Sequence, residues 1–173
     1  MKIYSTIALV ISISMLFSCA YKTIPIKGTY TDGNFEAYSE KNQEEVWSNL
    51  IDFFARKGLS IKIIDKSSGL LVSDKTPLIW TFENKKGLLN KSNAHVVLAQ
   101  TINPGPKKPL IPYGVFAEWN VRLKTVSGKT LVNINLVNPS YYLSPTNPIY
   151  TSFKSNDIKS TGNFERIIFD AIR

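Results

Sequence analysis

Residues 46–73 read VWSNLIDFFARKGLSIKIIDKSSGLLVS, and this stretch decides the fold class. Its first part predicts a helix over residues 43–57, because apolar residues recur there at helical spacing and form one broad stripe. The stripe consists of Val46, Trp47, Leu50, Ile51 and Phe54. Asn42 followed by Glu45 is typical of a capping box, and Gly58 stands where a left-handed residue ends a helix. We expect the stripe to pack on a sheet.

The second part of the same stretch predicts two paired strands. Residues 59–65 alternate, with apolar side chains at the odd positions, which indicates a half-buried strand. The sequence DKSSG at 65–69 has the composition of a turn, in which Gly69 is free to take a positive φ. Residues 70–73 then return as the partner strand. Asp65 is typical of a turn residue that bonds its own backbone, rather than of a catalytic acid.

The remainder of the chain predicts more strands and a second helix. Strands are expected at residues 35–39, 79–82, 94–102, 115–126 and 130–137, the last two forming a hairpin. The proline-rich residues 138–157 are expected as a crossover, and residues 163–172 as a closing helix with Glu165 near its positive end. The apolar stripe of this helix is Phe164, Ile167, Ile168, Ala171 and Ile172.

The predicted order is therefore β-α-β-β-(β)-β-β-β-α. Helices separated by runs of strands are typical of the α+β class. We expect a curved, mainly antiparallel sheet with two helices packed on one face.

The segment quoted above resembles the unit of helix, glycine, strand, turn and strand in helix-grip domains of BamC-like lipoproteins. The order of elements extends this resemblance over residues 35–172, with departures at 76–93 and 138–158. The resemblance implies a helix-grip fold and a non-enzymatic role in the cell envelope, so no catalytic residue is carried over. Fold similarity alone leaves the partner open.

The N-terminal residues 1–18 have the pattern of a signal peptide. Met1 and Lys2 give a short positive start, and an apolar or small-residue run of about 15 residues follows. This run is shorter than the roughly 20 apolar residues that a transmembrane helix needs. The alternative, a buried or amphipathic N-terminal helix, lacks a capping residue and a polar face at helical spacing.

Cys19 is the chain's only cysteine and follows directly on this run. Leu16-Phe17-Ser18-Cys19 resembles the lipobox of bacterial lipoproteins, although Phe17 is larger than the residue usual at its position. The resemblance implies that acyl chains are attached to the Cys19 thiol and that the signal is cleaved between Ser18 and Cys19. The alternative is an incidental cysteine in an ordinary signal peptide. No other cofactor is expected.

The residues after Cys19 bear on localisation and domain organisation. Ala20 is not the aspartate that retains some lipoproteins in the inner membrane, so the outer membrane is expected. The following residues lack the acidic cluster of a surface-export signal, which favours the periplasmic side. Residues 19–34 are aperiodic and predict a tether, part of which can pair as an edge strand. Residues 35–173 predict a single domain.

The composition excludes several functions. The chain carries a net charge of +8 with lysines scattered along it, which is typical of a solvated surface. The alternative is that the lysines attract a tethered domain to anionic lipid headgroups. The chain has no nucleic-acid recognition motif. Its only histidine, His95, opens an apolar strand, where a hydrogen-bonded core or edge histidine is the common outcome. With one histidine and one cysteine, a His/Cys metal cluster is excluded, and no metal site is expected. Hydrolase, phosphate-loop and zinc-protease motifs are absent, so the chain is not expected to be an enzyme.

Aromatic residues among prolines and asparagines are the candidate binding residues: Trp80, Tyr141, Tyr142 and Tyr150. Exposed tyrosine and tryptophan bind protein partners or sugar rings. The alternative is that they pin a long loop to the domain.

The leading hypothesis is a non-catalytic binding or scaffold module with an envelope protein or the cell wall as partner. The first alternative is a carrier of a small apolar ligand or lipid, held in a cavity between helix and sheet. Bulky side chains such as Trp47, Phe54 and Trp119 favour a filled interface there. The second alternative is a wall- or glycan-acting enzyme with two carboxylates distant in sequence.

Overall fold

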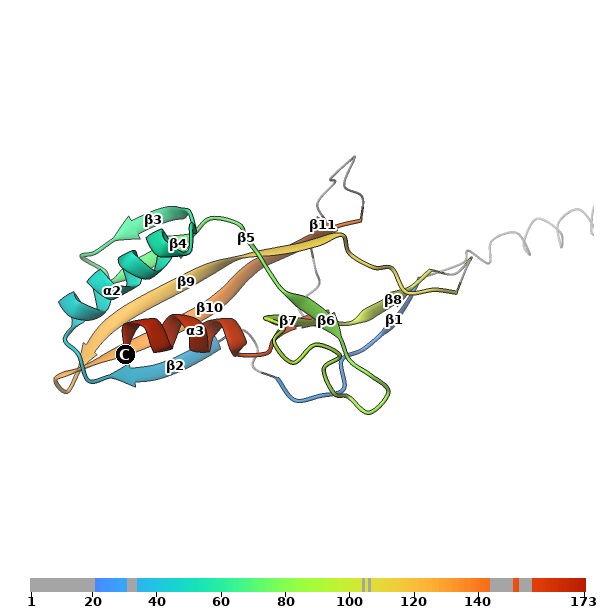
Figure 1. The fold of residues 1–173 in the computed structure, drawn as a ribbon, viewed down its shortest axis with the longest axis horizontal. Helices are drawn as coiled ribbons and strands as arrows, with labels where there is room; N and C mark the ends of the chain where they lie inside the picture. The colour runs from blue at the N-terminus through green and yellow to red at the C-terminus, as the bar shows by residue number, and fades with distance from the viewer. Residues whose placement is uncertain (1–20, 31–33, 104, 106, 144–150, 153–156) are drawn as a thin grey trace, which may run out of the picture.

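The computed structural model describes residues 21–30, 34–103, 105, 107–143, 151–152 and 157–173 (Figure 1). It is an α+β structure whose strand pairs are mostly antiparallel, which confirms the predicted class. The described elements, in chain order, are β1 (Lys22–Ile24), β2 (Asn34–Ser39), α2 (Gln43–Arg56), β3 (Ile61–Asp65), β4 (Leu70–Ser73), β5 (Thr76–Pro77), β6 (Trp80–Phe82), β7 (Val96–Leu98), β8 (Gln100–Ile102), β9 (Gly114–Val126), β10 (Lys129–Tyr142), β11 (Thr151–Ser152), β12 (Ile158–Ser160) and α3 (Asn163–Ile172).

The hairpin of β9 and β10, the two longest described strands, runs through the centre of the main sheet (Figure 1). Its two-residue turn, Ser127 and Gly128, has positive φ at both positions, the geometry that suits the twist of paired strands. This confirms the predicted hairpin. The predicted end of the second strand at Val137 is wrong, however, because β10 continues to Tyr142. Pro139 lies in a bulge of this strand and does not end it.

Within the described residues, seven strands form the main sheet around this hairpin. Strands β11, β10, β9, β4 and β3 follow one another in that order, while β2 also pairs with β10 and β5 with β9. At the edge, β3 exposes Ile63 by 45% and Ile64 by 58%. The expected half-buried alternation of this strand is therefore only partly present, because a register shift between Ile61 and Ile63 interrupts its pairing with β4.

The two described helices pack against each other and against strands of the main sheet. Helix α2 begins with the predicted capping box: the Glu45 amide donates to Asn42 Oδ1 at 3.0 Å, and the Asn42 amide donates to Glu45 Oε2 at 3.3 Å. Gly58 follows the helix with a φ of +64°, as predicted. Both ends of α2 are thus set by local sequence.

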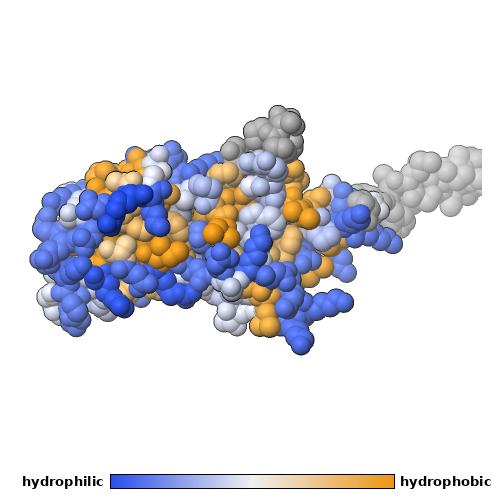
Figure 2. Space-filling view, in the orientation of Figure 1, coloured by the Kyte–Doolittle hydropathy of each residue, from blue (hydrophilic) through white to orange (hydrophobic). Residues whose placement is uncertain are grey.

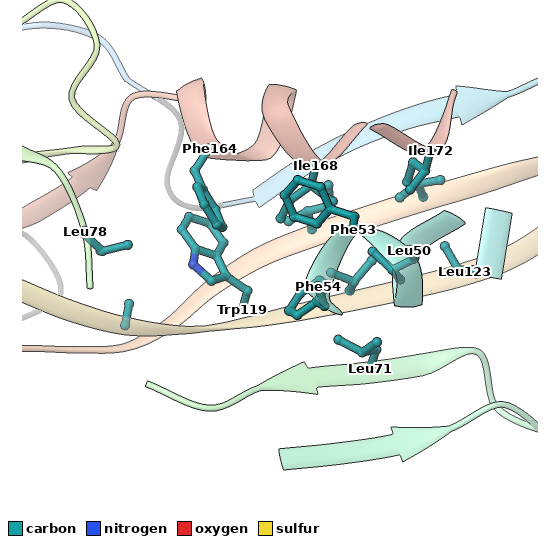
Figure 3. Close-up of a cluster of buried hydrophobic side chains, with 14 of the residues drawn as sticks. Leu50, Phe53, Phe54, Leu71, Leu78, Trp119, Leu123, Phe164, Ile168 and Ile172 are labelled. Carbon is teal, nitrogen blue, oxygen red and sulfur yellow. The ribbon is translucent and has the colours of Figure 1, made fainter. Parts of the chain in front are cut away.

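The core lies between the helices and the sheet (Figure 3). Helix α2 contributes Leu50, Phe53 and Phe54, and α3 contributes Phe164, Ile168 and Ile172. Trp119 of β9 meets Phe164 with ring centroids 4.5 Å apart. Bulky side chains therefore fill the helix–sheet interface.

The other half of the molecule departs from the predicted order. The expected strand at 94–102 is two strands: β7 joins β6 and β12 in a three-stranded sheet, and β8 pairs with β1. Strands β1, β5, β11 and β12 were not predicted as separate elements. Strand β1 belongs to the segment 19–34, so part of the predicted tether does pair as a strand. Among the described residues, no helix is long and apolar enough to cross a membrane.

Candidate functional site

An apolar cavity of about 450 Å³ lies between the β1–β8 pair, the three-stranded sheet and the end of β10. Side chains of Tyr21 and Thr23 border it from β1 and the residue before it, and Phe82 and Leu98 border it from β6 and β7. The remaining lining residues are Ala99, Thr101, Leu110, Pro112, Tyr141, Leu143, Thr151 and Asp157. Its size falls within the range of small-ligand sites, roughly 300–1,000 Å³.

The cavity exists because the chain changes sheets at Ala99. Strand β7 ends at Leu98 and stays hydrogen-bonded to β6 and β12, while β8 starts at Gln100 and turns away to pair with β1. The Ala99 amide donates to the Asp157 carbonyl at 2.9 Å, which holds the departure point in place. Alanine has no side chain beyond Cβ to fill the space between the diverging strands.

A bulge in β10 aims Tyr141 at this cavity. Val137 pairs with Glu118 and Ser140 with Phe116, so β10 contains one residue more than β9 over the interval. Tyr141 then lies opposite Val115, on the core side of the sheet, and lines the cavity. Tyr142 falls on the opposite face.

Glu118 holds the bulge. It is 7% exposed, and its Oε2 accepts a hydrogen bond from Asn138 Nδ2 at 3.0 Å. Its Oε1 accepts from Lys62 Nζ at 3.2 Å. Asn138 has a φ of +50°, a conformation that asparagine tolerates better than most residues. The carboxylate is thus part of the scaffold behind the cavity.

The structure separates the predicted binding aromatics. Tyr141 lines the cavity, but Tyr142 stacks on Phe116 with centroids 5.6 Å apart. Both tyrosines belong to β10 and not to a crossover loop, which corrects the expectation for residues 138–157. Trp80 lies in β6 beside the core, with its ring centroid 5.3 Å from that of Phe82. Tyr150 and Cys19 lie outside the described residues.

Glu83 fixes the N-terminal segment beside the cavity. Its carboxylate accepts hydrogen bonds from the backbone amides of Lys27 and Gly28, both at 2.7 Å. Burial, and then the hydrogen bond and negative charge of Glu83, raise the pKa of Tyr30 to about 12. A second hollow of about 470 Å³ lies on the other side of β1 and includes Ile24, Glu83 and Gln100. Residues 21–30 therefore pack as part of the domain.

Two further titratable side chains have shifted pKa values: His95, which precedes β7, and Glu165, in the first turn of α3. The Ile79 amide donates to His95 Nδ1 at 3.3 Å, and the His95 ring lies 4.9 Å from that of Phe164. Burial lowers the pKa of His95, which favours its neutral form. This is the predicted hydrogen-bonded histidine.

Glu165 was not identified as a buried residue from the sequence. It is 0% exposed, its Oε1 accepts a hydrogen bond from Ser160 Oγ, and its Oε2 has no partner among the described residues. Burial raises the pKa of Glu165, so the neutral acid is favoured. Ile167 is instead 42% exposed, which corrects the predicted stripe of this helix. The sequence does contain a signal for its burial: Ile168 and Ile172 follow Glu165 by three and seven residues, a spacing that places all three on one face of a helix.

The described residues contain no group of three histidine, cysteine, aspartate or glutamate side chains arranged to hold a metal ion. Comparison of the sequence with protein-family models and with curated proteins finds no match.

Proposed function

We propose that this chain is a lipoprotein of the outer membrane, anchored through acyl chains on Cys19 and facing the periplasm as a non-catalytic binding module. The lipobox-like residues 16–19, the preceding apolar run and the absence of Asp at position 20 support this proposal. We further propose that the domain is of the helix-grip, BamC-like type. Two helices that share one face of an antiparallel sheet support that finer assignment.

The single observation that carries the binding role is the apolar cavity. Its lining is dominated by apolar side chains and threonines, and among its described lining residues Asp157 is the only charged one. Such a site binds the apolar part of a ligand or an apolar side chain of a protein partner. A scaffold that grips a partner segment in this cavity is the leading candidate.

Carriage of a small apolar ligand or lipid is the second candidate, and the same cavity favours it. Its position differs from the one considered from the sequence, because the space between helices and sheet is filled. The cavity that could hold the ligand lies instead where β7 and β8 diverge.

A wall- or glycan-acting enzyme is the third option. It requires two carboxyl groups facing each other across a cleft. In the described part of the chain, the two hollows beside β1 have one carboxylate each, Asp157 and Glu83, and Glu83 is hydrogen-bonded to backbone amides. Neither hollow supports the two-carboxylate arrangement.

The test is purification of the lipidated protein from envelopes after gentle crosslinking, followed by identification of proteins and lipids that accompany it. Thr101→Phe fills the cavity from β8, and Thr125→Phe is the matched control at an exposed position in β9. A stoichiometric protein lost only from the Thr101 variant supports the scaffold. A lipid lost in the same way supports the carrier.

Both binding proposals fail if the wild-type protein emerges alone. They also fail if both variants co-purify with the same proteins and lipids as the wild type, because a molecule that binds in the cavity is displaced when Thr101→Phe fills it. Turnover of a wall or glycan substrate by the purified protein establishes the enzyme option instead.

A further inference from the structure

Exposed apolar side chains lie beside the cavity, at the end of the molecule that β1 and β8 form in Figure 1, where Figure 2 shows hydrophobic residues among hydrophilic ones. Tyr21 and Leu143 both line the cavity and are 61% and 47% exposed. Ile111, which precedes the buried Pro112, is 65% exposed. A hydrogen bond of 2.9 Å from the Tyr113 amide to the Tyr142 carbonyl fixes this segment on β10. The apolar side chains thus stand on ordered backbone.

The exposed charges on the segments around the cavity mouth are basic, and Asp157 is the one acidic residue in the described lining of the cavity. Lys22 pairs with Ile102 in the β1–β8 ladder, and Ile102 is bridged in turn to Pro109. Lys107 and Lys108 directly precede Pro109, and all three lysines are exposed. The segments 21–24, 100–103 and 107–113 contain no aspartate or glutamate. Basic side chains beside the exposed Tyr21 and exposed aliphatic side chains match the headgroup region of an anionic bilayer.

Covalent geometry places this end at the membrane if Cys19 carries the lipid. Only Ala20 separates Cys19 from Tyr21, so the Cα atoms of Cys19 and Tyr21 lie at most about 7 Å apart in any conformation. Tyr21 itself is held against the domain through the pairing of β1 with β8. The bilayer surface therefore cannot lie far from Tyr21 and the residues around it.

We infer that the surface formed by Tyr21, Lys107, Lys108, Ile111 and Leu143, here called the docking surface, lies on an anionic bilayer and turns the cavity mouth toward it. This inference rests on the proposed lipid attachment. It adds a defined orientation of the domain, with β3 and the tip of the β9–β10 hairpin away from the membrane.

The orientation is measured with an environment-sensitive nitrobenzoxadiazole label on the full lipidated protein. Ile111→Cys places the label in the docking surface, and Ile64→Cys places it on β3 at the opposite end. The two isoleucines are a matched pair, because they are 65% and 58% exposed and neither belongs to the core. The proteins are reconstituted in phosphatidylcholine vesicles with and without phosphatidylglycerol, together with headgroup-spin-labelled lipid.

The label at position 111 is expected to shift to shorter wavelength and to be quenched in vesicles that contain phosphatidylglycerol, while the label at position 64 stays in water. Lys107→Gln and Lys108→Gln each lower the ratio of docked to undocked domain by about fivefold on these vesicles. Equal quenching at both positions, or none at position 111, overturns the inference.

The wild-type protein separates failure of this inference from failure of the proposed function. Its only cysteine is Cys19, so a fully acylated protein has no thiol to label. If the wild type reacts with maleimide, the lipid attachment is wrong. If it does not react and the label at position 111 remains in water, the attachment stands and the docking surface alone is wrong.

Discussion

Glu165 is an acidic side chain in the interior of a small domain. Its first carboxyl oxygen is hydrogen-bonded to Ser160, but the second has no partner among the described residues. A buried carboxylate without compensation is costly, and protonation removes most of the cost. The neutral acid is consistent with the raised pKa that burial causes.

Replacement of Glu165 by glutamine is therefore expected to make the protein less sensitive to pH. The pKa of Glu165 is higher in the folded than in the unfolded chain, whose value is near 4.5. The stability provided by the neutral carboxyl is complete below that value and is lost as pH rises through the folded pKa. Urea titrations at roughly pH 4, below the unfolded value, and at roughly pH 8 measure this loss of stability.

Glu165→Gln is expected to reduce this loss, because the amide stays neutral and Oε1 still accepts from Ser160. Asp170→Asn, at an exposed position of the same helix, is the matched control and should leave the pH dependence as it is. An identical pH dependence in wild type and Glu165→Gln contradicts the buried neutral acid.

Single residues with local partners were predictable from sequence. Asp65 accepts a hydrogen bond from the Ser68 amide at 3.2 Å, and Asn42 caps α2, because both interactions join residues three apart. Glu165 was not predictable in this way. Its burial depends on the rotation of α3 about its axis, which packing against α2 and the sheet determines.

At the scale of elements, α2 is the clearest case of sequence determining structure. Trp47 is 8% exposed and belongs to the core. Trp47→Ala should lower the free energy of unfolding by about 3–5 kcal/mol, as expected when a buried aromatic is truncated. Denaturant titration measures this change, and Ile64→Ala on exposed β3 serves as the control. A Trp47→Ala effect within about 0.5 kcal/mol, the range of surface substitutions, contradicts the packing of α2.

The strands were less predictable than the helices because pairing joins distant residues. Residues 94–102 form one apolar run in sequence, and only the competing partners of β7 and β8 divide it at Ala99. In β10, Asn138 and Pro139 have the composition of a turn. In the structure the two residues form a bulge instead, which the hydrogen bond from Asn138 to Glu118 stabilises, and the strand continues beyond it.

At the scale of the molecule, the half that contains the two helices has a packed core, and the half that contains β1, β6, β7 and β8 has a cavity. The helices and the β9 face form the continuous core, whereas the cavity lies between sheets that diverge. The composition predicted the filled half, because bulky apolar residues lie on helix stripes. It did not predict the cavity, whose walls come from segments between Tyr21 and Asp157. Of the predicted aromatics, Tyr141 reaches this site through the bulge.

The anchored position of this cavity depends on Cys19, so acylation of that residue is the most direct test. Cells expressing the wild type or Cys19→Ser are grown with radiolabelled palmitate, and the immunoprecipitated protein is examined for label and length. The wild type should be labelled and shortened, and Cys19→Ser should remain an unlabelled, longer precursor. Equal label in the two proteins, or none in the wild type, contradicts the lipid-anchored module.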